Sequence, residues 1–431
     1  MIKPPLRRGN RAESVPPRGA RWATQTLFVA KAIQRKHVIG SGFMKVVFVS
    51  NYFNHHQKPF CEEMFQRLGE NFAFISTAVM REERRKLGYA QEDLPSYVNL
   101  AYENEQQLKH AMMLINEADA VIVGSAPEYM VKERIRAGKL VLRYSERLFK
   151  KKASFLRRAY HCIRFHIREC GSRNVYMLCA SAYTAGDCAS IGMYRNRTYK
   201  WGYFPALKEY DIDALLAKKK RNTLMWCGRF IDWKHPDDAI LLAKKLKSHG
   251  YAFQLNFVGT GDMEEELQRL VEQYELTDCV QFLGAMPPDQ VRIHMEEAGI
   301  FLFTSDRQEG WGAVLNESMN SGCAVVASHA IGSVPFLLQD EANGLIYPSG
   351  NVDAMFEKVR DLLKHPEEQE QLGRAAYKTV ITEWNAEIVV NRMVLFINSL
   401  INGVRLPNLF ENGPCSKAER IQDECIKEYL S

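Results

Sequence analysis

Short apolar runs alternate with amphipathic stretches along most of the chain from Met44 onward. The runs are rich in Val, Ile, Leu and Phe without polar alternation, which is typical of parallel strands buried on both faces. Between them, apolar residues recur at helical spacing. Predicted strands are residues 44–50, 72–77, 120–124, 140–144, 175–180, 223–227, 253–258, 280–283 and 300–304, and predicted helices include 59–68, 105–116, 237–248, 263–274 and 314–321. This alternation predicts an α/β fold with helices on both faces of parallel sheets.

The alternation lapses in the charged segment 205–221 and then restarts. In a chain too long for one ordinary core, this break predicts two doubly wound Rossmann-like domains that face each other across a cleft. Ligands of such sheets bind beyond the carboxyl ends of the strands, so chemistry is expected there. The predicted divisions are a basic, disordered extension at 1–43, an N-terminal domain at 44–204, a linker at 205–221, a C-terminal domain at 222–383, a helix at 384–401 and a tail at 402–431.

Charge is divided unequally between the two halves of the chain, although the net charge is only +6. Residues 1–200 hold 34 Lys and Arg against 17 Asp and Glu, a balance of +17, so the remainder carries −11. This split indicates that the first half faces an acidic partner, either phospholipid headgroups or nucleic acid. The acid-poor segment 1–43 has a transit peptide as its alternative interpretation.

The overall composition, 46% hydrophobic and 25% charged, indicates a globular protein. No run reaches the roughly 18 to 20 uncharged apolar residues of a membrane-spanning helix. Ten cysteines are scattered without a C-x-x-C pair or another metal-ligand spacing. This usage favours reduced, mostly buried thiols and a cytoplasmic protein.

Two glycine-containing loops follow predicted strands of the second domain. Gly228 and Arg229 come directly after the strand 223–227, and Lys234 follows shortly afterwards. A forked and a point cation at the carboxyl end of a strand suit a diphosphate, with a solvated surface pair as the alternative. The second loop, Gly259-Thr-Gly261, would admit a ligand to a helix N-terminus, unless it is only a tight turn.

A third loop, the stretch EGWGAVLNE from Glu309 to Glu317, follows the strand 300–304. On one continuous helix the two glutamates would lie roughly 12 Å apart, too far for the carboxylate pair of a retaining glycosidase at about 5 to 5.5 Å. Gly310 and Gly312 indicate a loop that precedes a helix. Backbone amides there favour phosphate, and the carboxylates can accept hydrogen bonds from sugar hydroxyls. Metal ligation by the two glutamates is the alternative.

Together these motifs resemble the donor half of retaining GT-B glycosyltransferases of family 4, the glycosyl transferases group 1. The resemblance covers residues 222 to about 400, whereas the first domain resembles the family mainly in its pattern. The motifs that carry it are Gly228-Arg229 with Lys234, the Gly-Thr-Gly turn, the two glutamates eight positions apart, SGCAVVAS at 321–328 and ANGLIYP at 342–348. The helix at 386–401 would cross back and brace the first domain, as in the family.

The resemblance implies a retaining, metal-independent sugar transfer from a nucleotide-sugar donor, without a cofactor. Arg229 and Lys234 would neutralise the leaving diphosphate, because the class resembles front-face substitution in which the leaving phosphate oxygen takes the acceptor's proton. Glu309 would contact hydroxyls of the donor sugar, and Glu317 those of the ribose. The remaining donor-binding candidates are Gly228, Gly259, Gly261, Phe282, Leu283, Gly284, Gly310, Trp311, Gly312, Ala313 and Val314.

On the acceptor side the chain departs from the family. Many relatives carry Gly-Gly after the first strand, whereas this loop is NYFNHHQK, without glycine, and the loop at 332–336 lacks the usual glutamate. Where relatives often have a His after a middle strand, this chain has Arg143-Tyr-Ser-Glu146, so Glu146 is the candidate catalytic carboxylate. The other acceptor-side candidates, which could instead be surface polar residues, are Asn54, His55, His56 and Gln57.

Two further stretches have competing interpretations. Asp211-Ile-Asp213 has the D-x-D form of metal-dependent glycosyltransferases of another fold, but in a linker an Asp that starts a helix is commoner. Residues 147–168 interleave eight Lys and Arg with Leu, Phe, Tyr and Ile and contain no acid. They suit docking on an anionic inner leaflet, where lipid-linked acceptors reside, with nucleic acid binding or an ordinary solvated helix as the alternatives.

The sequence therefore predicts a hexosyltransferase that moves a sugar, in our interpretation from a UDP-sugar, to a glycan or lipid-linked acceptor in cell-surface polysaccharide or glycolipid synthesis. We expect a cytoplasmic protein with peripheral attachment to the inner face of the membrane through 147–168, and no metal, cofactor or nucleic acid. The alternatives are a phosphorylase or hydrolase on the same scaffold and a non-catalytic nucleotide- or nucleic-acid-binding protein.

Overall fold

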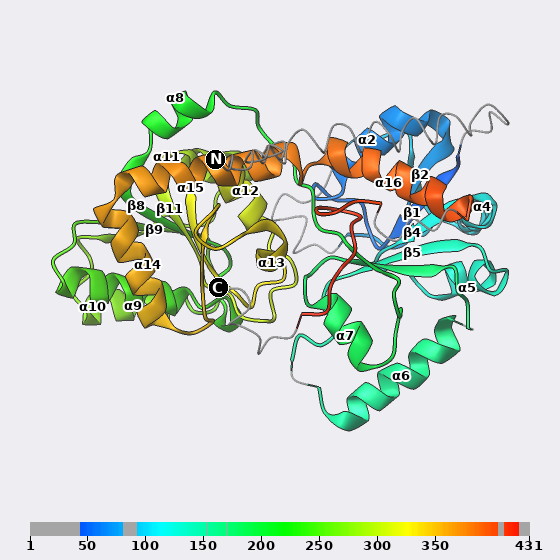
Figure 1. The fold of residues 1–431 in the computed structure, drawn as a ribbon, viewed down its shortest axis with the longest axis horizontal. Helices are drawn as coiled ribbons and strands as arrows, with labels where there is room; N and C mark the ends of the chain where they lie inside the picture. The colour runs from blue at the N-terminus through cyan, green and yellow to red at the C-terminus, as the bar shows by residue number, and fades with distance from the viewer. Residues whose placement is uncertain (1–43, 81–92, 152, 170, 404–408, 422–431) are drawn as a thin grey trace, which may run out of the picture. The chain divides into compact units, whose positions relative to one another are not determined.

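The structure, a computed structural model, describes residues 44–80, 93–151, 153–169, 171–403 and 409–421. From Lys45 onward the chain forms one compact unit, which contains two parallel sheets of seven and six strands with helices packed on them (Figure 1). The α/β class and the two doubly wound sheets are thus confirmed. The predicted extension at 1–43, with its alternative of a transit peptide, lies outside the described residues.

The first sheet has the strand order β3-β2-β1-β4-β5-β6-β7, with every pairing parallel. The inner strand β1 is buried along its whole length, in keeping with its mostly apolar sequence VVFVS. The strands are β1 (Val46–Ser50), β2 (Phe72–Ser76), β3 (Val98–Leu100), β4 (Ala120–Val123), β5 (Leu140–Ser145), β6 (Val175–Cys179) and β7 (Thr198–Lys200). The helices in this part are α2 (Lys58–Leu68), η1 (Gly69–Asn71), α4 (Glu105–Glu117), α5 (Tyr129–Arg136), α6 (Phe155–Glu169) and α7 (Thr184–Ser190).

The second sheet repeats this order as β10-β9-β8-β11-β12-β13, again parallel throughout. The order reverses between β8 and β11, a position where open α/β sheets bind ligands beyond the strand ends. The strands are β8 (Lys220–Cys227), β9 (Gln254–Val258), β10 (Val280–Phe282), β11 (Ala298–Phe303), β12 (Ala324–Ser328) and β13 (Leu345–Tyr347). The helices are α8 (Ile212–Ala217), η2 (Asp232–Lys234), α9 (Pro236–Ser248), α10 (Glu264–Gln273), α11 (Pro288–Glu297), α12 (Val314–Asn320), α13 (Val334–Leu337), α14 (Val352–Lys364), α15 (Pro366–Thr382) and α16 (Ala386–Ile401).

The predicted linker 205–221 contains the helix α8 and the start of β8. The charged residues of this segment suggested a linker, but Lys219 is buried. Its Nζ donates to the backbone oxygens of Met295 and Ala298 at 2.8 and 2.9 Å. Asp211 caps α8, since its carboxylate accepts hydrogen bonds from the backbone of Asp213 and Ala214. The interpretation of Asp211 as a helix-starting residue is therefore confirmed.

The described end of the chain returns to the first sheet. Helix α16 packs against α2, and its Phe396 ring lies 4.5 Å from the ring of Tyr199 on β7. A short segment further on then runs antiparallel to β7: Lys200 N donates to Ser416 O at 2.7 Å, and Ala418 N donates to Thr198 O at 3.1 Å. The edge strand β7 is thereby covered.

The cysteines in the described ranges are free thiols, and most of them are buried. This agrees with the predicted reduced state of these residues. Among the helices that the structure describes, all are too short or too polar to cross a bilayer.

Candidate functional site

The loops after β8, β9 and β10 pack backbone against backbone. A Cβ on Gly259 would lie 1.9 Å from Gly228 O, and Gly259 itself has φ +134°, which a side chain would strain. Gly259 N donates to Gly284 O at 2.8 Å. A Cβ on Gly261 would likewise lie 2.5 Å from Phe230 O. The glycines of the Gly-Thr-Gly turn are thus needed for the close approach of these loops, whether or not a ligand is bound.

Lys234 and Glu309, both predicted site residues, form a nearly buried ion pair. Lys234 belongs to η2 and Glu309 follows β11, and the Nζ to Oε2 distance is 2.5 Å with side-chain exposures of 13% and 11%. Ser305 Oγ also donates to Glu309 Oε2 at 3.1 Å. The ammonium is therefore held in a fixed position at the carboxyl end of the second sheet. Arg229 is exposed nearby in the sequence and has no ion pair with any described residue.

The stretch from Glu309 to Glu317 is a loop followed by a helix, as predicted. Gly312 has φ +81°, where a side chain would also meet the Phe303 ring, and α12 begins at Val314. Within the described chain, the backbone N–H groups of Gly310, Trp311 and Gly312 have no hydrogen-bond acceptor. Such free amides beside a fixed ammonium form a place suited to an anion.

Glu317 lies half-buried on α12 near the end of β8. Burial raises the pKa of its carboxyl group, and the Arg292 guanidinium partly opposes this rise. Burial and the Glu317 carboxylate raise the pKa of the neighbouring Cys227 thiol to about 12, with Lys234 acting in the opposite direction. The Glu317 carboxylate accepts no hydrogen bond from the residues that the structure describes. It is therefore available to accept hydrogen bonds from ligand hydroxyls.

Glu146, from the first sheet, lies against the loop that contains Gly310. It follows β5, and its Oε1 accepts a hydrogen bond from the Tyr203 hydroxyl at 2.6 Å while its Oε2 pairs with Lys150 at 2.7 Å. A Cβ added to Gly310 would lie 1.9 Å from Glu146 Oε2, so the carboxylate rests against the Gly310 backbone. The structure thus brings the predicted acceptor-side carboxylate to the loop that carries Glu309.

Tyr203 contacts the candidate site, although the sequence did not indicate it. It lies after β7, 57 positions from Glu146, and burial, with Tyr144 and Glu146 nearby, raises the pKa of its hydroxyl well above the ordinary value. The group therefore stays protonated and donates to Glu146. Nothing in the local sequence marks it, because its partner is brought close only by the fold.

The predicted acceptor loop, residues 54–57, is linked to Glu146 through Tyr203. The His56 ring stacks on Tyr203 with centroids 5.8 Å apart, and His55 and His56 lie 3.8 Å from each other. Asn54 Oδ1 accepts from the His56 backbone at 2.9 Å, which fixes the turn. Gln57 Nε2 donates to Ser50 Oγ at 3.4 Å, and its buried Oε1 has no partner in the described chain. These residues form a polar and aromatic surface beside Glu146.

The remaining donor candidates contribute mainly backbone. The Trp311 ring is fully buried, its Nε1 donates to Asn316 Oδ1 at 2.9 Å, and it packs on Gly202 and the Trp384 ring. The Phe282 ring stacks on Phe257 at 5.2 Å. Leu283, Gly284, Ala313 and Val314 lie half-exposed at the adjoining loop ends. A ligand would meet the main chain at these positions more than the rings.

Comparisons with known proteins give a family match for part of the chain and relatives of known description. Residues 208–379 match the family described as glycosyl transferases group 1. An amylovoran biosynthesis glycosyltransferase of Erwinia amylovora is 29% identical over 167 residues, which is 38% of this chain and 41% of that protein. A GDP-mannose-dependent phosphatidylinositol monomannoside mannosyltransferase of Mycobacterium tuberculosis is 23% identical over 184 residues, 41% of this chain and 48% of that protein. The chain therefore matches less than half the length of these curated relatives.

Among solved structures, Anabaena HepE in complex with UDP superposes with a TM-score of 0.61 at 14% identity. That match covers 83% of this chain and all of the other, so the two share a fold from the first sheet to the second. The chain has the GT-B fold, and its residues 208–379, which include Lys234, Glu309 and Glu317, match the family model of the glycosyl transferases group 1.

Proposed function

We propose that this chain is a retaining hexosyltransferase that moves a sugar from a nucleotide-sugar donor, a UDP-sugar, to a glycan or lipid-linked acceptor without a metal or cofactor. The observation that carries the proposal is the Lys234 ammonium fixed 2.5 Å from Glu309, beside the free amides of Gly310 to Gly312. A held cation with oriented N–H groups suits the diphosphate of the donor. The proposed setting is the cytoplasm, at the inner face of a membrane.

Glu309 and Glu317 would hold the two ends of the donor. Lys234 and Ser305 both bind Oε2 of Glu309, which leaves Oε1 to accept hydrogen bonds from the sugar hydroxyls. The Glu317 carboxylate, which has no hydrogen-bond donor among the described residues, would accept hydrogen bonds from the ribose hydroxyls. Filling a buried carboxylate's unmet hydrogen-bonding capacity favours the bound state. Arg229, exposed after β8, would add a second cation to the diphosphate.

In the proposed reaction, the acceptor oxygen bonds to the anomeric carbon on the face from which the diphosphate departs. The bond between that carbon and the β-phosphate oxygen breaks, and the acceptor's proton passes to that oxygen. Lys234 and the amides of Gly310 to Gly312 stabilise the charge that develops on the diphosphate. Glu146, fixed by Tyr203 and Lys150, would orient the acceptor hydroxyl.

The relatives support the substrate class. The Erwinia relative is described as an enzyme of amylovoran biosynthesis, and the mycobacterial relative as acting on phosphatidylinositol monomannoside. A glycan or lipid-linked acceptor in polysaccharide or glycolipid synthesis is common to both descriptions. UDP in the HepE complex favours a uridine donor, whereas the mycobacterial enzyme uses GDP-mannose.

Thermal unfolding with UDP-, GDP- and ADP-sugars tests the donor site. We expect a UDP-sugar to raise the Tm of the wild type, and Lys234→Ala and Glu317→Ala to remove this rise. Lys245→Ala is a matched control, because Lys245 lies on α9 in an exposed pair with Asp353 and should leave the rise intact. Lys234→Ala should also lower the transfer rate about 10²- to 10³-fold, the usual effect of losing one group that stabilises a developing anion.

Two outcomes would contradict the proposal. If no nucleotide sugar stabilised the wild type, or if the stabilisation survived in both site variants, the donor site would be wrong. Binding that never leads to sugar transfer, with polysaccharide and lipid-linked acceptors supplied, would instead indicate a non-catalytic nucleotide-binding protein.

A further inference from the structure

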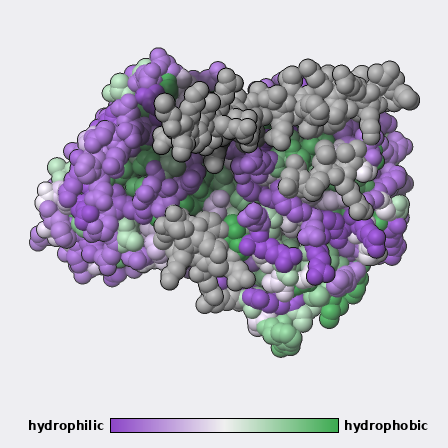
Figure 2. Space-filling model, viewed as in Figure 1, coloured by the Kyte–Doolittle hydropathy of each residue, from purple (hydrophilic) through white to green (hydrophobic). Residues whose placement is uncertain are grey.

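Helix α6 presents an apolar stripe to solvent. Leu156, Tyr160, Ile163 and Ile167 are spaced by four, three and four residues, so they lie along one side of the helix. Their exposures are 78%, 58%, 62% and 73%. In Figure 2 hydrophobic residues gather along this helix at the lower edge of the view. A stripe at this spacing ordinarily faces a protein core, whereas here it faces outward.

Basic side chains run along the same helix beside the stripe. Arg157 and Arg164 are seven positions apart, so they share a side of α6, and both are exposed. Lys151, also exposed, precedes the helix. No acidic residue occurs between positions 147 and 168. The outer surface of α6 therefore combines large apolar side chains with positive charge.

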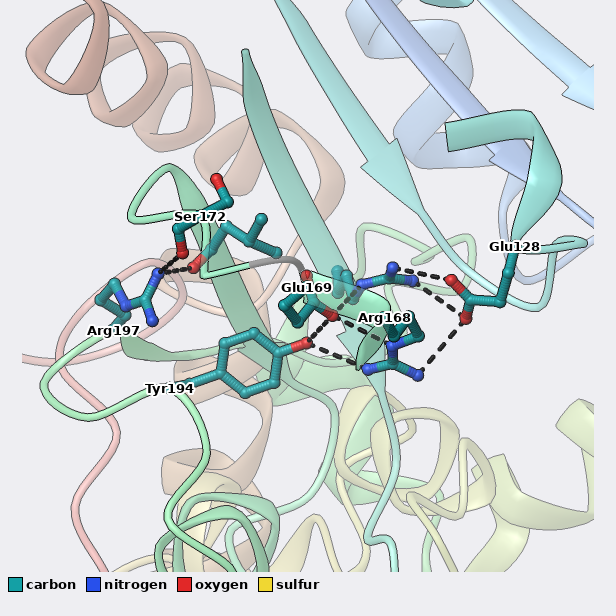
Figure 3. A network of polar contacts seen from close by, with 8 residues as sticks. Glu128, Arg168, Glu169, Ser172, Tyr194 and Arg197 are labelled. Atoms are coloured by element: carbon teal, nitrogen blue, oxygen red, sulfur yellow. Dashed lines mark hydrogen bonds and ion pairs between the residues drawn. The ribbon is translucent and has the colours of Figure 1, made fainter. Parts of the chain in front are cut away.

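The opposite side of α6 is fixed to the first sheet. Glu169, buried at the end of the helix, pairs with Arg143 Nε at 2.7 Å and accepts a hydrogen bond from the Tyr194 hydroxyl at 2.9 Å. Arg168 and Arg143 both pair with Glu128 at the start of α5. Figure 3 shows Glu128, Arg168, Glu169 and Tyr194 pointing toward one another. A buried ion pair network of this kind holds the helix in one orientation, with its apolar stripe outward.

These observations distinguish between possible occupants of the surface. A second copy of the chain would place Arg157 and Arg164 near the same residues of its partner, which is repulsive. Nucleic acid would pair with the arginines but has little use for exposed Leu and Ile side chains. An anionic bilayer accepts both parts, because apolar side chains enter the acyl boundary and arginines bind headgroup phosphates.

We propose that α6 is a bilayer-docking helix, which lies in the plane of an anionic lipid surface with Leu156, Tyr160, Ile163 and Ile167 inserted and Arg157 and Arg164 at the headgroups. Residues 147–168 are thereby divided into an inserting face, a headgroup-binding face and an anchored face. The inference rests on the membrane setting of the proposed function and names the element that would bind the lipid. Its test needs no sugar donor, so its failure would be distinguishable from a failure of the proposed sugar transfer.

Vesicle flotation of the full chain tests the proposal, with phosphatidylcholine vesicles that contain or lack phosphatidylglycerol. The wild type should float with the anionic vesicles and much less with the neutral ones. Ile163→Gln with Ile167→Gln should lower the partition coefficient at least about tenfold, because two aliphatic side chains no longer enter the bilayer. Arg157→Gln with Arg164→Gln should lower the partition coefficient about fivefold per charge removed. Added salt should also lower the partition coefficient of the wild type.

Matched variants elsewhere on the surface distinguish docking through α6 from nonspecific binding to vesicles. Ile293→Gln changes an isoleucine of similar exposure, 52%, on α11, and Arg269→Gln changes an exposed arginine on α10. Both should float like the wild type, and all variants should unfold at the same temperature. Failure of the wild type to float, or equal loss in the control variants, would overturn the proposal. If Ile163→Gln with Ile167→Gln bound vesicles as well as the wild type and RNA displaced the vesicles, the surface would be assigned to nucleic acid. If the wild type were a dimer and this variant a monomer, the surface would be assigned to a second copy of the chain.

Discussion

The loops at the carboxyl ends of the two sheets are built differently. In the second sheet, Gly259 and Gly261 let main chain pack on main chain, and the free amides of 310–312 remain beside Lys234. In the first sheet, side chains hold the loops together, because Tyr203 and Lys150 bind Glu146 and the His56 ring stacks on Tyr203. Glycine and charge at fixed spacing can be seen in a sequence, whereas a side-chain network assembled from distant segments cannot. The proposed donor site can therefore be predicted from the sequence, whereas the contacts on the proposed acceptor side appear only in the folded structure.

The contact between the two sides provides the sharpest test of this comparison. Gly310→Ala should lower the free energy of unfolding by about 1 to 3 kcal/mol, since its Cβ would fall 1.9 Å from Glu146 Oε2. Urea denaturation measures the loss, and the transfer rate should fall with it. In a Glu146→Ala background the same change should cost much less, because the obstructing carboxylate is gone. An equal cost in both backgrounds would mean that the two loops do not meet through Glu146.

A smaller effect is expected from the side-chain network. Tyr203→Phe removes the hydroxyl that donates to Glu146 Oε1 and should lower kcat about tenfold, the usual magnitude for a hydrogen bond to a charged group. Donor affinity, measured by calorimetry, should not change. Tyr199→Phe serves as the control, because Tyr199 contributes its ring to a contact with Phe396. If Tyr203→Phe weakened donor binding as much as turnover, Tyr203 would belong to the donor side.

The smallest effect concerns the proposed donor side, where we expect the buried Glu317 carboxylate to reduce stability in the absence of ligand. Burial raises its pKa above the ordinary 4.5, so the ionised form is penalised in the folded chain at any pH above the raised value. As the pH falls through that value toward 4.5, the folded chain takes up the proton first and the penalty disappears. Glu317→Gln should therefore raise the free energy of unfolding near neutral pH by about 1 kcal/mol, with the gain vanishing in acid.

Denaturation curves across the pH range measure this gain. Glu103→Gln, at an exposed position outside the helices and strands, should show no such pH dependence. If the gain in the free energy of unfolding persisted in acid, or were equal for Glu317→Gln and Glu103→Gln, burial of the Glu317 carboxylate would not be its cause. Loss of donor binding in the same variant would show that the stability penalty accompanies the binding function.

Most of the fold could be predicted because buried parallel strands such as β1 and β11 are apolar along their whole length. The start of β8 could not be predicted, because the charged residues Lys220 and Arg221 resemble a linker although they begin a strand beside the buried Lys219. Lys234, Glu309 and Glu317 were predicted as site residues from their spacing and motifs, and the structure brings the first two together as an ion pair. Trp311 was assigned to the donor from its neighbours, yet its ring packs on Gly202, a contact that depends on a segment over a hundred positions away.

The antiparallel segment along β7 has a consequence for how the chain is made. A parallel sheet with an open edge presents unpaired N–H and C=O groups that other chains can join. Here the groups of Thr198 and Lys200 are satisfied by Ser416 and Ala418, which leave the ribosome more than two hundred residues later. Although an N-terminal domain ordinarily folds first during synthesis, the edge of this one stays unpaired until residues 416–418 have been made and have paired with β7. The nascent chain therefore exposes a sheet edge that can pair with other strands for as long as residues 416–418 are missing.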